Sequence, residues 1–282
     1  MEILDGKKVK LEILNSLKKE LLNEKTNPGL AVIQVGNDPA SSVYVKNKSK
    51  MASDLNYKFE HIKLDENVSM DDVLNIIYAL NKDESISGIL VQMPLPKHLD
   101  EKVIQNAIDY KKDVDGLTDI NMGKLAHNVD SLVPCTPMGI VDLLKNYNID
   151  IEGKCVTIVG RSDLVGKPLS NLMTNNNATV ILCHSKTNNL EIYTKLADIL
   201  VVAIGKPNYI KKEHVKDGAI VIDVGINRTS EGLVGDVDFE NVKDKVSYIT
   251  PVPGGVGQMT VAELGKNTYK AYKLNMNLTR NK

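Results

Sequence analysis

The chain has 282 residues, of which 42% are hydrophobic and 25% are charged, as in a globular protein with one large or two modest domains. Its formal net charge of −1 argues against a nucleic-acid-binding or acidic-membrane surface, and no run approaches the roughly 20 apolar residues of a membrane span. The three cysteines lack Cys-x-x-Cys spacing, which argues against disulfides, and the histidines lack the spacing of metal ligands. The N-terminus does not resemble a signal peptide, which argues against export. Together these features predict a cytoplasmic protein.

Apolar runs and amphipathic stretches alternate along the whole chain. The amphipathic stretches predict helices over 7–24, 41–54, 69–81, 137–147, 166–175 and 260–274. The apolar runs predict strands over 30–35, 88–91, 156–159, 179–182, 199–203 and 219–222. Because their apolar residues are consecutive and often β-branched, these strands are expected to be buried on both faces by helices. The pattern predicts an α/β fold with mainly parallel sheets.

A domain boundary is expected where two prolines bracket a helix start, with Thr136 as N-cap and Pro137 at the first helical position. Residues 155–204 then form a β-α-β-α-β run, which is typical of a mononucleotide-binding half. We expect the last helix to return to the first domain. This predicts one domain of residues 1–137 plus 261–282 and a second, Rossmann-like domain of residues 138–260, with a cleft between them.

Four residues of the first half are candidates for a reactive site. Tyr44 and Lys48 are spaced i, i+4 and share a helix face, although this spacing alone favours a solvated helix. A functional Lys48 would need partial burial, since desolvation lowers the pKa of an amine toward neutrality. Gln92 ends a strand, where α/β proteins bind ligands, or else it caps the following turn. Asp115 precedes Gly116 and could simply stabilise a turn.

A glycine turn in the second half predicts a nucleotide site. The strand that ends at Gly160 leads through Arg161 and Ser162 to a helix start at Gly166. This spacing departs from Gly-x-Gly-x-x-Gly, but backbone N–H groups at a helix start still attract phosphate. The alternative is an ordinary tight turn between a strand and a helix.

The following strand indicates which dinucleotide would bind. NAD sites usually place an acid about 20 residues beyond the glycine turn. Here residues 183–187 contain Ser185 and Lys186, and no carboxylate occurs before Glu191. Together with Arg161, these donors favour the additional phosphate of NADP, although they could also form an ordinary polar loop.

The sequence resembles the bifunctional methylenetetrahydrofolate dehydrogenase/methenyltetrahydrofolate cyclohydrolase family along nearly its whole length. The matching segments, in order, are Val35–Ser41 leading to Tyr44 and Lys48, Gly88–Pro96, Lys112–Gly116, Pro134–Pro137, Gly160–Ser162 leading to Pro168, Asp223–Asn227, Gly235–Val237 and Thr250–Gly257. Because these segments are long and keep their order, a chance match is excluded in practice.

The resemblance implies a role for each matching position. Lys48 would be the general acid/base, Gln92 would orient the reacting centre, Tyr44 would stack near the folate, and Asp115 would hydrogen-bond its pterin. The positions implied to contact the cofactor are Gly160, Arg161, Ser162, Ser185 and Ile226. The first domain would bind folate and the second NADP.

The resemblance also implies the reaction and its partners. NADP would take a hydride from the one-carbon bridge of 5,10-methylenetetrahydrofolate, and water would then open the methenyl product to 10-formyltetrahydrofolate. These are reactions of one-carbon metabolism, which supplies purine, methionine and histidine synthesis. The family implies a homodimer, with tetrahydrofolate one-carbon compounds as substrates and no nucleic-acid, membrane or metal partner.

One position departs from the family pattern. The family usually reads Val-Gly-Pro-Met-Thr after the last glycine turn, whereas Gln258 stands here in place of the proline. Glutamine releases the backbone and adds an N–H, so the geometry of this loop is expected to change. Two alternatives to the bifunctional enzyme stay open. One is an enzyme that retains only the dehydrogenase step because the Gln258 loop is altered. The other is a non-catalytic binder of NADP or folate on the same fold, since fold alone does not prove activity.

Overall fold

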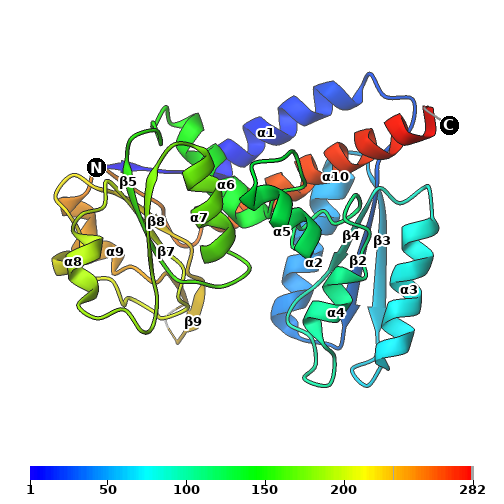
Figure 1. The fold of residues 1–282 in the computed structure, drawn as a ribbon, viewed down its shortest axis with the longest axis horizontal. Coiled ribbons are helices and arrows are strands. Elements are labelled where there is room, and N and C mark those ends of the chain that lie inside the picture. The colour runs from blue at the N-terminus through cyan, green and yellow to red at the C-terminus, as the bar shows by residue number, and fades with distance from the viewer. Residues whose placement is uncertain (231, 281–282) are drawn as a thin grey trace. The chain divides into compact units, whose positions relative to one another are not determined.

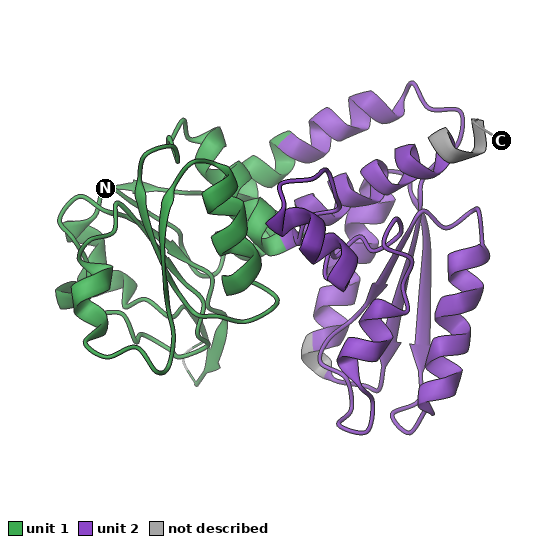
Figure 2. Cartoon of the chain, viewed as in Figure 1, with its two compact units in different colours: residues 1–12, 136–260 green, residues 13–135, 261–282 purple. Residues whose placement is uncertain are grey.

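Two parallel sheets organise the chain in the computed structural model, which describes residues 1–230 and 232–280, apart from the side chains of residues 39, 40 and 277–280. Within these residues the chain forms two compact units (Figure 2). Unit 1 contains Met1–Glu12 and Thr136–Thr260, and unit 2 contains Ile13–Cys135 and Val261–Lys282. The predicted α/β fold with mainly parallel sheets is confirmed.

The sheet of unit 2 has the strand order β3-β2-β4, and its neighbouring strands are parallel. The strands are β2 (Gly29–Val35), β3 (Lys58–Leu64) and β4 (Gly88–Val91). The helices that lie in this unit are α2 (Pro39–Asp54), α3 (Met70–Lys82), α4 (Glu101–Asn106) and α5 (Asp119–Ala126) (Figure 1). Helices α1 (Gly6–Leu21) and α10 (Val256–Arg280) each contribute residues to both units.

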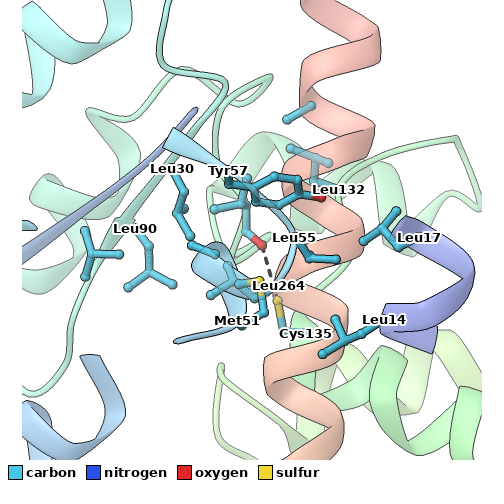
Figure 3. Packing of buried hydrophobic residues seen from close by; sticks show 14 of the residues in the cluster. Leu14, Leu17, Leu30, Met51, Leu55, Tyr57, Leu90, Leu132, Cys135 and Leu264 are labelled. Atoms are coloured by element: carbon cyan, nitrogen blue, oxygen red, sulfur yellow. Dashed lines mark hydrogen bonds between the residues drawn. The ribbon is translucent and has the colours of Figure 1, made fainter. Parts of the chain in front are cut away.

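The central strand β2 is buried on both faces, as its consecutive apolar residues predict. Leu30 and Val32 pack into one hydrophobic cluster together with residues of α1, α2 and α10 (Figure 3). Ala31 and Ile33 point to the opposite face and pack with residues of α3 and α4. Because successive side chains of a strand alternate between faces, this one strand supplies both cores of the unit.

The sheet of unit 1 has the order β1-β11-β8-β7-β5-β6, and each neighbouring pair is parallel. Its strands are β1 (Glu2–Ile3), β5 (Cys155–Val159), β6 (Thr179–Cys183), β7 (Ile199–Val202), β8 (Ile220–Asp223) and β11 (Tyr248–Ile249). The helices are α6 (Cys135–Asn146), α7 (Gly166–Asn175), α8 (Leu190–Thr194) and α9 (Phe239–Val242), with 3-10 turns at Lys212–His214 and Lys243–Lys245. An antiparallel hairpin joins β9 (Asn227–Thr229) to β10 (Gly232–Val234).

The structure differs from the sequence-based expectations at the domain boundary and at the start of α6. Residues 1–12 lie in unit 1, although the predicted boundary grouped them with residues 13–137, because β1 pairs with β11 through Glu2 N–H to Ser247 C=O at 2.7 Å. Helix α6 begins at Cys135, one residue before its predicted N-cap, Thr136. The Thr136 hydroxyl is therefore inside the first turn, where it hydrogen-bonds the hydroxyl of Thr260 at 3.0 Å.

A membrane-spanning helix was not expected, and among the described helices none combines the necessary length with sufficient hydropathy. Within the same residues, no group of three His, Cys, Asp or Glu side chains is placed to hold a metal ion.

Candidate active site

Lys48 and Gln92 meet in unit 2. Lys48 lies on α2, whose first turn is capped by the Asp38 carboxylate accepting from the Ser41 N–H at 2.7 Å. The half-buried Lys48 donates from its Nζ to Gln92 Oε1 at 2.7 Å. Gln92 follows β4 and is only 9% exposed, and its Nε2 donates to the Met93 carbonyl at 2.6 Å. Both ends of the Gln92 amide are therefore engaged, and its oxygen is directed at the amine.

Asp115 is electrostatically coupled to this amine. Burial lowers the pKa of Lys48, and the negative charge of Asp115 opposes that shift. In turn, burial raises the pKa of Asp115, while the positive charge of Lys48 opposes the rise. The two groups thus share a poorly solvated environment in which each stabilises the charged form of the other. A proton at this site is held less tightly than on a lysine in water.

The segment that carries Asp115 is anchored on its N-terminal side by Asp113, which is fully buried. The Asp113 carboxylate accepts from the Gly116 N–H at 3.0 Å, the Thr118 N–H at 2.8 Å and the Asn121 Nδ2 at 2.9 Å. Asp113 lies within the segment Lys112–Gly116 but is not among the residues that the sequence predicts for the site. Its position two residues before Asp115, next to a glycine turn, is the signal that could have identified it.

Helix α10 anchors the same segment from another direction. Asn267 Nδ2 donates to the Val114 carbonyl at 2.9 Å and to the Val133 carbonyl at 2.8 Å. The buried thiol of Cys135 also donates to the Val114 carbonyl, at 3.2 Å (Figure 3). Burial raises the pKa of Cys135 well above its usual value, so this residue is held as a neutral thiol. Asn267 has no local sequence signal, because its partners are known only once the chain has folded.

Tyr44 lies one helical turn before Lys48 on α2, as its spacing predicts, and is 40% exposed. Its ring therefore retains accessible surface on the helix that also carries the amine. An accessible aromatic ring at such a position can pack on a planar ligand.

The glycine turn of unit 1 is built for close backbone approach. Gly160 follows β5 with φ of 127°, and a Cβ there would stand 2.1 Å from the Ala203 carbonyl oxygen. A Cβ on Gly166 would stand 1.9 Å from the Gly160 carbonyl oxygen. Helix α7 therefore begins directly against the end of the strand, and its first N–H groups lie beside the turn. This arrangement suits a phosphate group.

The other predicted cofactor residues also follow strand ends of this sheet. Arg161 and Ser162 are exposed after β5, and Ser185 is exposed after β6. The Gly160 N–H donates to the Cys183 carbonyl at 2.9 Å, which brings the two turns together. Ile226 is 45% exposed and comes after β8. Because parallel strands end at one edge of a sheet, all these residues belong to the edge where α/β proteins bind nucleotides.

Two buried carboxylates that sequence reasoning did not select organise this edge. Asp223, at the end of β8, accepts from the Gly225 N–H at 3.0 Å, the Asp236 N–H at 2.9 Å and the Val237 N–H at 2.9 Å. Asp236 accepts from the N–H groups of residues 204–206, at 2.7 to 3.0 Å. Burial raises the pKa of Asp223 to about 7, although its backbone hydrogen bonds lower it. Together they tie the loop after β7 to the loop after β8.

Comparison with protein families matches most of the chain. Residues 4–115 match the family described as tetrahydrofolate dehydrogenase/cyclohydrolase, catalytic domain. Residues 134–276 match the one described as tetrahydrofolate dehydrogenase/cyclohydrolase, NAD(P)-binding domain.

Individual proteins are similar over almost their entire length. The bifunctional protein FolD of Campylobacter concisus is 51% identical over 275 residues, which cover 96% of this chain and 97% of that protein. The crystal structure of the bifunctional FolD from Campylobacter jejuni is 46% identical with a TM-score of 0.95, covering 97% of this chain and 99% of that one. FolD of Trypanosoma brucei, solved with NADP and an inhibitor, is 35% identical with a TM-score of 0.92, covering 97% and 98% respectively.

Proposed function

The chain belongs to the tetrahydrofolate dehydrogenase/cyclohydrolase family, and on this premise we propose that Lys48 is the general acid/base of its active site. The enzyme is bifunctional: it oxidises 5,10-methylenetetrahydrofolate to the methenyl compound with NADP and hydrolyses that product to 10-formyltetrahydrofolate. The observation that carries the role of Lys48 is its 2.7 Å hydrogen bond to Gln92, made by an amine whose pKa is lowered by burial.

The hydrolytic step needs a group that moves protons. Water attacks the methenyl carbon and loses one proton, which Lys48, with its lowered pKa, accepts. Lys48 then gives this proton to the ring nitrogen as the carbon–nitrogen bond breaks, and the new hydroxyl loses its own proton to solvent as the formyl C=O forms. Gln92 holds the amine in place during both transfers. The negative charge of Asp115 favours the ammonium form of Lys48 and so limits how far burial lowers its pKa.

The oxidation asks less of the protein. NADP, when bound, supplies the acceptor for the hydride of the one-carbon bridge. The protein contributes the orientation of the two reactants, which lowers the barrier without proton transfer. We assign the stacking of the folate to Tyr44 and the recognition of its pterin to Asp115, as the family resemblance implies. The exposed ring of Tyr44 on α2 supports the first assignment.

We assign cofactor binding to Gly160, Arg161, Ser162, Ser185 and Ile226. The close approach of Gly166 to Gly160 at the start of α7 supports a phosphate there. Arg161 and Ser185 provide donors for the additional phosphate that distinguishes NADP from NAD.

The division of labour between the domains is also a proposal. Unit 2, which holds most of the predicted folate-binding domain of residues 1–137 plus 261–282, would bind the folate. Unit 1, which includes residues 138–260, would bind NADP. The cleft between the domains stays a prediction.

We further propose that the protein is a cytoplasmic homodimer. The free thiols of Cys135, Cys155 and Cys183 in the described structure suit a reducing compartment. Light scattering should then give a mass twice the 31.0 kDa of one chain. A mass equal to one chain would refute the dimer and leave the activity untouched.

A chromatographic product assay tests the function. The enzyme is given 5,10-methylenetetrahydrofolate with NADP and, separately, with NAD. We expect 10-formyltetrahydrofolate to form with NADP. Accumulation of the methenyl compound alone would indicate a dehydrogenase without cyclohydrolase activity. Absence of turnover with both cofactors would indicate a non-catalytic binder.

A further inference from the structure

Gln258, which replaces the family's proline, is held by hydrogen bonds at both its backbone and its side chain. It lies in the first turn of α10, and its N–H donates to the Gly255 carbonyl at 3.1 Å. A proline would lack this donor but would restrict φ at the same position. The expected freedom of the loop is thus countered by a bond that proline could not make.

The side chain of Gln258 is held by the N-terminal helix. Lys10 on α1 donates from its Nζ to Gln258 Oε1 at 2.7 Å, and both side chains are half-buried. One helical turn earlier, a Cβ on Gly6 would stand 2.1 Å from the Gly255 carbonyl oxygen. Residues 6 and 10 of α1 therefore lie against residues 255 and 258, within unit 1. Gly255 therefore packs against Gly6 of α1, and Gln258 is hydrogen-bonded to Lys10 of the same helix.

The first turn of α10 also contacts Ile226, one of the residues assigned to cofactor binding. A Cβ on Gly257 would stand 3.2 Å from Ile226 Cδ1, so the side chain of Ile226 rests against the backbone beside Gln258. Ile226 is 45% exposed. A shift of the first turn of α10 would therefore move this contact.

We propose that Lys10 and Gln258 are positioning residues that together take over the restraint of the missing proline. Their hydrogen bond holds the first turn of α10, and this turn holds Ile226 in the orientation that receives NADP. The inference rests on the proposed role of Ile226 in cofactor binding. The restraint by this hydrogen bond differs from the restraint by a proline in one respect. It depends on a second residue, Lys10, and is lost when that residue is changed.

The test combines variants that remove each partner with one that restores the proline. Lys10→Met removes the donor, and Gln258→Met removes the acceptor without altering the backbone. Each should raise the KM for NADP by about fivefold, because a hydrogen bond to a charged group is lost, and the double variant should be no worse than either single one. Hydrolysis of the methenyl compound, which consumes no NADP, should keep its kcat. Lys8→Met, on the exposed face of α1, controls for the lost charge.

The proline variant makes the test decisive. In Gln258→Pro the restraint is built into the backbone, so adding Lys10→Met should leave the KM for NADP unchanged. First-turn residues have no N–H partner four residues earlier, and proline is tolerated there. The inference fails if Lys10→Met alone leaves the KM unchanged. It also fails if Lys10→Met raises the KM equally in both backgrounds, since Lys10 would then act on the cofactor independently of Gln258.

A second readout separates this inference from the proposed function. The rise in the thermal unfolding midpoint on adding NADP reports binding without turnover. It should be smaller in Lys10→Met and Gln258→Met than in the parent chain, and equal in the parent and Gln258→Pro. If the parent chain shows neither turnover nor a thermal shift with NADP, the proposed function fails. If the parent responds and the variants match it, only the positioning role fails.

Discussion

The amine of Lys48 and the side-chain oxygen of Gln92 lie 2.7 Å apart, although the two residues are 44 positions apart in the chain. One is on the helix that follows β2 and the other is at the end of β4, the strand beside it. The parallel sheet thus delivers an amine and its hydrogen-bond acceptor to one point.

Lys48→Met should abolish ring opening while sparing hydride transfer. Methionine nearly matches the apolar stem of lysine but has no amine that could accept or donate a proton. We expect hydrolysis of the methenyl compound to fall by about 10²- to 10⁴-fold, the usual contribution of a general acid/base. The rate of NADP reduction should change far less. Both rates can be followed in one reaction by chromatography. Lys46→Met, exposed on the same helix, serves as the control.

Asp115→Asn should move the pH dependence of the hydrolysis. The charge of Asp115 raises the pKa of Lys48 against the effect of burial, so its removal lowers the pKa of Lys48 further. The limb of the kcat profile that reports Lys48 should therefore shift to lower pH. Asp119→Asn, an exposed carboxylate nearby in the chain, should leave the profile in place. A shift to higher pH would contradict the electrostatic coupling.

Gly166→Ala should weaken NADP binding. The added Cβ would stand 1.9 Å from the Gly160 carbonyl oxygen, so the strand end and the start of α7 must separate. Calorimetry should show at least a tenfold loss of affinity for NADP, about 1.4 kcal/mol. Hydrolysis of the methenyl compound should continue. Gly123→Ala is the matched control, because a Cβ added at Gly123 would meet nothing within 4 Å. Unchanged affinity in Gly166→Ala would place the phosphate elsewhere.

Asp223 should titrate near neutrality. Burial raises its pKa from 3.8 to about 7, so its contribution to folding is complete below about pH 3.8 and is lost as the pH rises through about 7. Carbon-13 NMR of the carboxyl groups, with Asp223→Asn used for assignment, measures the midpoint directly. Chemical denaturation at pH 5 and pH 8 should show the corresponding loss of stability. A midpoint at or below 3.8 would mean that the backbone N–H donors outweigh burial.

The sequence was informative where the physics is local. Consecutive apolar residues predicted the central strands, and glycine before a helix predicted the turn at Gly160. Strand β3 was not predicted, because it lies at the edge of its sheet and its apolar residues, Phe59, Ile62 and Leu64, neither form a run nor alternate regularly. β1 and β11 are too short to leave a pattern and exist through their pairing.

In the candidate site, too, the sequence indicated individual residues but not the contacts between them. Lys48, Gln92 and Asp115 each occupy a suggestive local context, but no local pattern states that the amine meets the amide or shares its burial with the carboxylate. Asn267 and Lys10 were invisible for the same reason. Their partners, Val114 and Gln258, are 153 and 248 positions away. Such contacts exist only in the assembled fold.

The anchoring of the Asp115 segment by Asn267 has a consequence for the order in which the enzyme is made. Protein synthesis proceeds from the N-terminus, and domains tend to fold as their residues emerge. Here α10 supplies both the amide that holds the Val114 carbonyl and Leu264 of the surrounding core. A ribosome-bound chain therefore already contains Lys48, Gln92 and Asp115 before Asn267 can anchor the segment that carries Asp115. Catalytic competence should therefore arrive only after α10 has left the exit tunnel.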